Sequence, residues 1–305
     1  MNYKHIDGLV AATFTPYNKR GELDLGKIKP YAEHLISNQI KGIFVCGTSG
    51  EGLLLTVKER MKVLEAWMPY QNSLIVIPHI SATSYKDSME LAVHAGSIGV
   101  DAIGCMGQCY LPPKRTHELV AINKIIADCA PKTPYYYYHL PNVSGVHVKM
   151  NAFLKEASKV IPNLVGIKFT STDLMDMQEC ILLENGRFDI LHGHDEILLS
   201  GLAAGSTGGV GTSYNLIPNL YQKIILAFQA GDYLNARKLQ LRSIDFVKIM
   251  LKYENSVVST KAMFKIAGLD LGPCRLPLRN LTKHENELLE KDLKELDFFN
   301  DIKIC

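Results

Sequence analysis

The sequence has no CxxC pair of cysteines, no large surplus of charge of either sign and no long apolar run. Its seven cysteines include one close pair, Cys105 and Cys109, without a second set of metal ligands, so we interpret the cysteines as free thiols. The 33 Lys and Arg residues against 31 Asp and Glu residues leave a formal net charge of +2. So small a surplus does not indicate a polyanionic partner, and it argues against nucleic-acid binding.

No apolar stretch reaches the roughly 20 residues that a helix needs to cross a bilayer, and even the stretch 164–169 contains Lys168. The start of the chain carries Lys4, His5 and Asp7 and lacks the apolar core of a secretory signal. With 47% hydrophobic and 21% charged residues, the composition is that of a globular protein rather than a disordered or fibrous one. We therefore expect a soluble, cytoplasmic protein without a membrane partner.

Short runs rich in β-branched and aromatic residues recur along the first two thirds of the chain, and helical periodicity follows them. The expected strands cover 9–14, 42–46, 74–80, 101–106, 135–140, 164–169, 188–192 and 209–212, with helices that include 56–67, 84–95, 116–129, 151–160 and 173–183. Strands that alternate with helices need parallel pairing and right-handed crossovers. The pattern therefore predicts an α/β fold, a (β/α)8 TIM barrel, with an open doubly wound sheet as the alternative.

From about Pro218 the alternation stops and the chain reads as helices, among them 219–229, 233–251 and 283–299. The segment 268–277 contains Gly272, Pro273 and Pro277, which predict a break between helices. We expect residues 1–230 to form the barrel with the active site. Residues 231–305 are expected to form a helical C-terminal extension that packs on it.

Lys168 is the most informative single residue, because it interrupts the apolar run of an expected buried strand. Side-chain alternation places Ile167 and Phe169 on one face of the strand and Lys168 on the other, so an outward apolar pair would turn the lysine into the barrel. Burial disfavours the charged amine, and a pKa lowered by about three units would make it a nucleophile toward a ketone. A lysine in a buried ion pair, or one that reaches water at the strand end, is the alternative.

Two further strand ends point to a ligand site at the same rim of the barrel. Among the tyrosines 135–138, Tyr138 lies nearest the rim and can present its hydroxyl to a ligand, unless it only packs in the core. The glycine-containing loop 47–51 can form a concave site of backbone N–H groups, to which the Thr48 and Ser49 hydroxyls add donors. A carboxylate suits this site, whereas the lysine of a phosphate-binding loop is lacking; a plain turn is the alternative.

The segment after the seventh expected strand invites a metal interpretation. His192 and His194 are separated by one residue on a strand and are followed by Asp195 and Glu196. No third and fourth ligand is clearly placed, and the two acidic side chains can equally hydrogen-bond sugar hydroxyls. A metal-dependent barrel hydrolase stays open as an alternative.

Taken jointly, four motifs resemble the N-acetylneuraminate lyase family, within the pyruvate-dependent aldolases that also include dihydrodipicolinate synthase. The motifs are the loop 47–51, Tyr138 followed by Pro141 and Ser144-Gly145, the Gly166-x-Lys168-x-Thr170 run, and the segment 193–196. The resemblance implies a class I aldolase that needs no metal or cofactor. Such an enzyme cleaves N-acetylneuraminate reversibly to pyruvate and N-acetylmannosamine.

The resemblance also implies roles for individual residues. Lys168 would form the Schiff base and Tyr138 would move the proton of the C4 hydroxyl. The substrate-binding residues would be Thr48, Ser49, Thr170, Gly193, Asp195, Glu196 and Thr212. Lyases of this family use a tyrosine from a neighbouring subunit of a homotetramer, and Tyr110 corresponds to it in position, although its surrounding sequence departs from the family pattern.

Some residues bear on the choice within the superfamily. Val143 lies where synthases usually carry an arginine for a diacid, which argues against the synthase, while His139 and Thr212 depart from the usual lyase Asn and Ser. An aldolase for another 2-keto-3-deoxy sugar acid and a synthase-like condensation stay open. From a different class, a non-catalytic sugar-acid sensor stays open as well.

Overall fold

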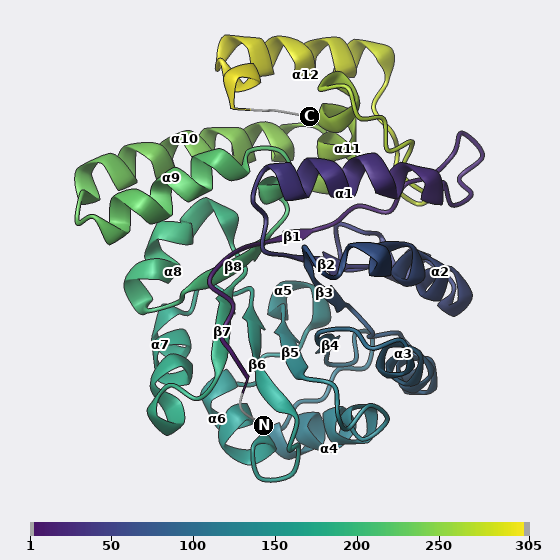
Figure 1. Cartoon of the computed structure of the whole chain (residues 1–305), viewed down its shortest axis with the longest axis vertical. Helices are drawn as coiled ribbons and strands as arrows, with labels where there is room; N and C mark the ends of the chain where they lie inside the picture. The colour runs from purple at the N-terminus through teal and green to yellow at the C-terminus, as the bar shows by residue number, and fades with distance from the viewer. Residues whose placement is uncertain (1–2, 302–305) are drawn as a thin grey trace.

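The computed structural model describes residues 3–301, and in this part of the chain eight parallel strands form one sheet in the order β3-β2-β1-β8-β7-β6-β5-β4. The strands are β1 (Gly8–Ala12), β2 (Gly42–Val45), β3 (Ile75–Pro78), β4 (Ile103–Met106), β5 (Tyr135–His139), β6 (Leu164–Phe169), β7 (Asp189–His192) and β8 (Gly208–Gly211). A parallel bridge between His79 and Gly104 joins the two ends of the sheet. The strands therefore enclose a barrel, as the sequence predicts (Figure 1).

Helices follow the strands and cover the outside of the barrel (Figure 1). They are α1 (Ile28–Ser37), α2 (Val57–Trp67), α3 (Tyr85–Ser97), α4 (Thr116–Ala127), α6 (Met150–Ala157), α7 (Leu174–Leu182), α8 (Leu198–Ala204) and α9 (Pro218–Gln229), while the short α5 (Pro141–Ser144) belongs to the loop after β5. Helix α2 begins at a capping box, in which the backbone N–H of Glu59 donates to the Thr56 hydroxyl at 3.2 Å and the Glu59 carboxylate accepts from the Thr56 N–H at 2.9 Å.

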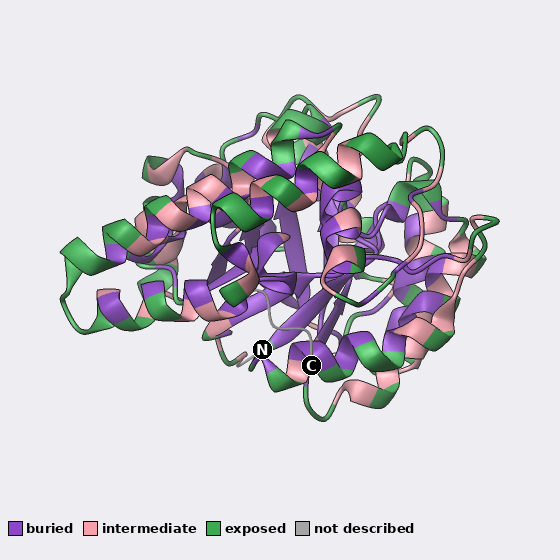
Figure 2. Cartoon of the chain, turned by 90° about the horizontal axis from the view of Figure 1, so that it is seen from above, coloured by how far each residue is buried: buried purple, intermediate pink, exposed green. Residues whose placement is uncertain are grey.

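Two apolar layers surround the strands, and the alternation of side chains along each strand separates them. Ile167 and Phe169 belong to the layer between the strands and the helices. Phe44, Tyr138 and Val165 belong to a second layer inside the barrel. Figure 2 shows the strands buried and the helices exposed on their outer faces. Because Lys168 follows Ile167 on β6, it points into the barrel, as the alternation predicts.

The C-terminal part consists of α10 (Tyr233–Lys252), α11 (Ser256–Ile266) and α12 (Lys283–Glu295), which lie at one end of the molecule in Figure 1. Helix α11 packs on α1, where the ring of Phe264 lies 5.2 Å from that of Tyr31. The last expected helix is shorter than predicted, since Asp297 adopts a left-handed backbone with φ 56° and ends it. None of the helices within residues 3–301 has both the length and the apolar character needed to cross a membrane.

Candidate active site

The amine of Lys168 lies inside the barrel, and its side chain is almost completely buried, with 5% exposed. Its Nζ lies 3.9 Å from the ring centre of Phe44 and 4.0 Å from that of Tyr138. Within residues 3–301, no carboxylate forms an ion pair with this amine, whose neighbours are the two rings. Lys168 is therefore neither part of a buried ion pair nor a strand-end lysine that reaches water. Loss of hydration lowers the pKa of Lys168 to about 7, although the negative charge of Asp195 opposes the shift. Near neutral pH, about half of the amine is therefore uncharged and nucleophilic.

This pKa predicts the pH dependence of ketone capture. Only the neutral amine attacks, so the rate should rise with pH through about 7 and level off above it. At pH 5 it should fall to about one hundredth of the plateau, because each pH unit below the pKa lowers the neutral fraction tenfold. The rate of pyruvate capture in single-turnover cyanoborohydride trapping measures this. A rate that still climbs between pH 9 and 10 would indicate an ordinary exposed lysine instead.

Tyr138 stands beside Lys168 in the barrel, because the two residues are register partners on β5 and β6. Its hydroxyl lies 3.4 Å from the Thr48 hydroxyl, at the edge of the hydrogen-bonding range. Burial raises the pKa of Tyr138 to about 12, so the neighbouring lysine does not lower it. Tyr138 therefore stays protonated at neutral pH. It can pass a proton on only while it receives another from a partner such as Thr48.

The loop 47–51 reaches over to the end of β8. The Ser49 and Thr212 hydroxyls lie 2.7 Å apart, and the Thr15 hydroxyl donates to the Gly50 carbonyl at 2.6 Å, which fixes the loop. Gly52 is required where the chain turns back, because a Cβ there would overlap the Cys46 carbonyl. Both of the predicted carboxylate-binding hydroxyls, those of Thr48 and Ser49, thus come from one turn beside Tyr138 and Lys168.

Glu51 ends this loop in a left-handed conformation with φ 55°, and its carboxylate is buried. The Lys261 amine of α11 donates to Oε1 at 2.7 Å, and the Arg275 backbone N–H donates to Oε2 at 2.8 Å. The side chains of Glu51 and Lys261 are only 1% and 2% exposed. The C-terminal helices are therefore anchored to the loop that carries Thr48 and Ser49.

The loop after β7 supplies the other predicted binding residues. Gly193 is needed here because a Cβ would overlap the Thr170 side chain at the end of β6. The Asp195 carboxylate accepts hydrogen bonds from the backbone N–H and the hydroxyl of Ser213, both at 2.6 Å. Burial raises the pKa of Asp195 to about 6. Glu196 is half-exposed and pairs with His194 at 3.2 Å.

The barrel thus holds a buried lysine with a buried tyrosine beside it and a hydroxyl-bearing loop at its mouth. The chain as a whole matches one known family. The model of the dihydrodipicolinate synthetase family matches residues 5–296. The chain belongs to this family. The match covers the barrel and most of the C-terminal helices together.

Within the dihydrodipicolinate synthetase family, the chain is similar to proteins named N-acetylneuraminate lyase. The mouse protein of that name is 38% identical over 302 residues, which cover 97% of this chain and 94% of the mouse protein. The structure of N-acetylneuraminate lyase from Proteus mirabilis superposes with a TM-score of 0.93 at 36% identity, covering 97% of this chain and 100% of that one. The sialic acid aldolase from Aliivibrio salmonicida gives a TM-score of 0.94 at 34% identity, with 99% of both chains covered.

Three residues that bear on the choice within the family lie in different surroundings. His139 points outward from β5, where its ring lies 5.0 Å from that of Phe169, so the departure from Asn does not change the mouth of the barrel. Val143 is 56% exposed and lines the mouth. Tyr110 lies between β4 and α4, is 86% exposed and has a left-handed φ of 65°. Its ring is therefore displayed at the surface of its own chain.

The four candidate metal ligands do not converge. His192 points outward from β7 against α8, where a Cβ on Gly201 would overlap its ring, while Asp195 is directed toward Ser213. The described part of the chain contains no group of three or more His, Cys, Asp or Glu residues placed to hold a metal ion. The metal interpretation, which the sequence left open as an alternative, therefore finds no assembled set of ligands among the described residues, since helix packing against Gly201 occupies His192.

Sequence reasoning missed two buried polar residues that support the site, His79 beside Tyr138 and Lys261 beneath the loop 47–51. His79 follows β3 and is buried against Tyr138, with ring centres 5.5 Å apart. A histidine that closes an apolar strand is a signal of the same kind as Lys168. Nothing in the sequence links Lys261 to Glu51, since the two residues are 210 positions apart.

Proposed function

We propose that this protein is a class I aldolase, a carbon–carbon lyase that cleaves N-acetylneuraminate reversibly to pyruvate and N-acetyl-D-mannosamine. The observation that carries the proposal is the buried amine of Lys168, which lies against the ring of Tyr138 inside the barrel and has a pKa lowered to about 7. The names of the similar proteins from mouse, Proteus mirabilis and Aliivibrio salmonicida support the choice of substrate. Val143, which brings no positive charge for a second carboxylate, favours this reaction over a synthase-like condensation.

In the first step, the neutral amine of Lys168 adds to the C2 ketone of the open-chain substrate. Loss of one water molecule leaves a protonated imine, whose positive charge attracts electrons. The substrate carboxylate on C1 would lie on the loop 47–51, where the hydroxyls of Thr48 and Ser49 and the backbone N–H groups can donate to it. The mouth-facing loop thus orients the ketone over the amine.

In the second step, the bond between C3 and C4 breaks. The imine takes up the bonding electron pair and becomes an enamine, while the C4 hydroxyl loses its proton and becomes the aldehyde of N-acetylmannosamine. Tyr138 would move that proton in concert with Thr48 or the substrate carboxylate, because its own pKa is too high for a free phenolate. Protonation of the enamine at C3 and addition of water then release pyruvate and regenerate Lys168.

The hydroxyl-bearing tail would lie along the β6 to β8 side of the mouth. We propose that Asp195, Glu196 and the Gly193 backbone bind its hydroxyls, with contacts from Thr170 and Thr212. Asp195 already accepts two hydrogen bonds from Ser213, which hold the carboxyl group in one orientation. A fixed acceptor of this kind discriminates between sugar epimers.

Pyruvate release across a small panel of substrates tests the proposal. Purified protein should release pyruvate from N-acetylneuraminate and should do so much more slowly, if at all, from ketodeoxygluconate. It should not consume pyruvate with aspartate semialdehyde. Faster turnover of ketodeoxygluconate would assign the protein to another 2-keto-3-deoxy acid, and binding of N-acetylneuraminate without any pyruvate release would indicate a sensor.

Replacing Tyr138 by phenylalanine should lower kcat for cleavage by about 10²–10⁴-fold, because the C4 proton then has no relay. Capture of pyruvate on Lys168 needs no such relay at C4, so borohydride trapping of pyruvate should fall much less. Steady-state pyruvate release and mass spectrometry of the trapped protein measure the two effects. Equal losses in both assays would mean that the ring only packs against Lys168.

A homotetramer, a cytoplasmic location and a contribution of Tyr110 to the site of a neighbouring subunit belong to the same proposal. The exposed ring of Tyr110 and the adjacent Leu111, which is 80% exposed, support a contact between subunits through this loop. Light scattering of the purified protein should give about four times the mass of one chain. Cell fractionation tests the location.

A further inference from the structure

His79 is a buried polar side chain at the mouth of the barrel that the reaction steps above do not use. It lies where β3 meets β4, and Ile77, two residues before it, faces the barrel interior. Its ring lies 5.5 Å from the ring of Tyr138 and 5.9 Å from the ring of Phe44, the two rings that enclose the Lys168 amine. His79 is therefore part of the wall around the reacting centre.

The protonation of the ring follows from its partners. The Nδ1 atom lies 3.2 Å from the Cys46 carbonyl oxygen, which can only accept, so Nδ1 carries the hydrogen. Burial, together with the positive charges of Arg60 and Lys168, holds the pKa of His79 well below its usual range. The ring is neutral, and Nε2 keeps a free lone pair. This atom is buried and accepts no hydrogen bond from any residue within 3–301.

The orientation of the ring is also held from behind. Arg60 of α2 donates to the His79 carbonyl and, at 2.6 Å, to the Ser81 carbonyl. The guanidinium group is buried, so it fixes the backbone on both sides of Ile80. A buried acceptor such as His79 Nε2 costs free energy when no donor pairs with it. A ligand that brings a donor to this atom would recover that cost.

His79 lines a cavity of about 350 Å³ whose other walls are mostly apolar, among them Leu53, Met106 and Val143. Thr48 also lines it, and the Thr48 hydroxyl lies 3.4 Å from that of Tyr138, so the cavity opens directly beside the reacting centre. Two polar lining residues are engaged elsewhere: Glu51 pairs with Lys261, and the Asn255 side chain caps α11. The mouth thus has an apolar half here, opposite the acidic half formed by Asp195 and Glu196.

We propose that this cavity binds the N-acyl group of the substrate, with His79 Nε2 accepting the amide N–H and the apolar walls enclosing the methyl group. The inference rests on the proposed function and assigns a specificity-determining residue to it. In N-acetylneuraminate the amide is attached to C5, next to the C4 hydroxyl assigned to Tyr138 and Thr48. The amide N–H matches the Nε2 acceptor and the methyl group matches the apolar walls. The carbonyl oxygen between them needs a donor, which the Ser256 hydroxyl on the lining of the same cavity can supply.

The test compares two acceptor aldehydes in condensation with pyruvate: N-acetylmannosamine, which has the amide, and mannose, which has a hydroxyl in its place. The readout is the ratio of the two kcat/KM values. Replacing His79 by leucine should lower this preference for N-acetylmannosamine at least about tenfold, since the amide N–H then loses its acceptor. His79→Gln, whose side-chain oxygen can accept a hydrogen bond, should retain more of the preference than His79→Leu.

A second variant keeps the test decisive if changes at His79 impair folding. Val143 is exposed, so Val143→Phe should fold normally while it narrows the cavity. The unchanged protein should accept N-propanoylmannosamine with kcat/KM within about threefold of N-acetylmannosamine, because the cavity has room for another methylene. In Val143→Phe, the ratio of kcat/KM for N-propanoylmannosamine to kcat/KM for mannose should be at least about tenfold lower than in the unchanged protein.

The outcomes separate the two levels of the proposal. If the unchanged protein neither traps pyruvate with borohydride nor releases it from N-acetylneuraminate, the proposed function fails. If it does both, but His79→Leu lowers kcat/KM for the two aldehydes by the same factor and Val143→Phe does not select against the longer acyl group, the N-acyl site is wrong and the lyase remains.

Discussion

Replacing Lys168 by methionine should lower kcat for pyruvate release by at least about 10⁴-fold, because no other group can form the imine. The free energy of unfolding should stay the same or rise, since methionine fills a similar volume and the desolvation of the amine no longer opposes folding. Steady-state assays and urea unfolding measure the two quantities. An active variant that releases pyruvate at a tenth of the original rate would overturn the Schiff-base mechanism.

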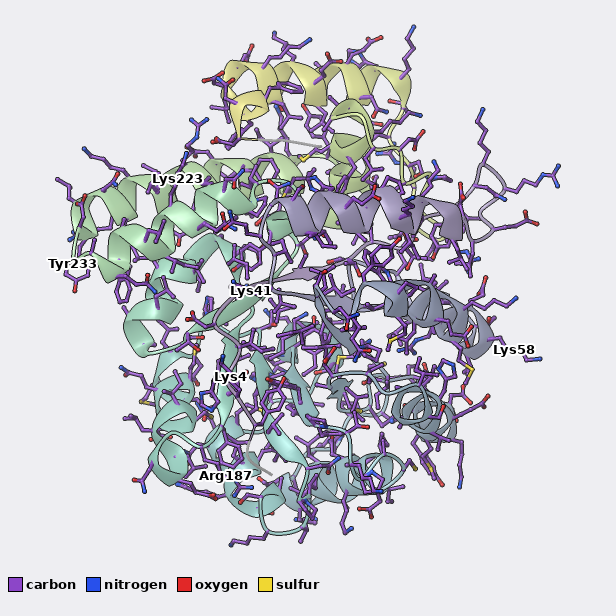
Figure 3. The ribbon with its side chains drawn as sticks, viewed as in Figure 1. Lys4, Lys41, Lys58, Arg187, Lys223 and Tyr233 are labelled. Atoms are coloured by element: carbon purple, nitrogen blue, oxygen red, sulfur yellow. The ribbon has the colours of Figure 1, made fainter. Side chains whose placement is uncertain are left out.

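Lys223→Met is the matched control for this change. Lys223 lies on α9 and is exposed, like the other lysines labelled in Figure 3, whereas Lys168 is buried inside the barrel. The control should keep full activity and should trap pyruvate as well as the unchanged protein. Together the two variants separate the chemistry of one buried amine from a general effect of removing a lysine.

Replacing Lys261 by methionine should lower the free energy of unfolding by about 3–5 kcal/mol, because it leaves the buried carboxylate of Glu51 without its ion-pair partner. The same change should raise the KM for pyruvate, since Glu51 anchors the loop that carries Thr48 and Ser49. Urea unfolding and initial rates check these two effects. A variant with unchanged stability and unchanged KM would show that the ion pair holds neither the fold nor the loop.

Two comparisons make this prediction specific to burial. Lys124→Met removes an exposed partner of Asp128 and should cost at most about 1 kcal/mol. The double variant Glu51→Gln and Lys261→Met should recover a large part of the lost stability, because neither remaining group carries an unpaired charge. If the double variant is no more stable than Lys261→Met alone, the loss comes from altered packing of α11.

The sequence predicts the barrel and the central residue of the site for one physical reason. A parallel strand buried on both faces is a nearly continuous apolar run, so the charge at Lys168 stands out and its neighbours Ile167 and Phe169 determine the direction in which it points. The capping box that the structure shows at Thr56 and Glu59 is of the same local kind, because it depends on residues only three positions apart. Both features depend only on residues that are close together in the sequence.

Contacts between distant parts of the chain are not predictable in this way. Alternation alone does not say which face of β7 points outward, and the packing of His192 against Gly201 of α8 decides it. Helices α1, α8 and α11 are not distinguished by the sequence pattern; α8 is only seven residues long and contains a glycine. The predicted roles of the binding residues and of Tyr110 stay predictions until substrate complexes are measured.

The anchoring of the loop 47–51 by α11 has a consequence for biosynthesis. A ribosome that has made the first 230 residues has already made every strand, the nucleophile and the tyrosine, but not the amine that neutralises Glu51. Prematurely terminated chains should therefore lack a competent keto-acid site even where their barrels close. Full activity should therefore appear only when the last quarter of the polypeptide has been synthesised and α11 has docked.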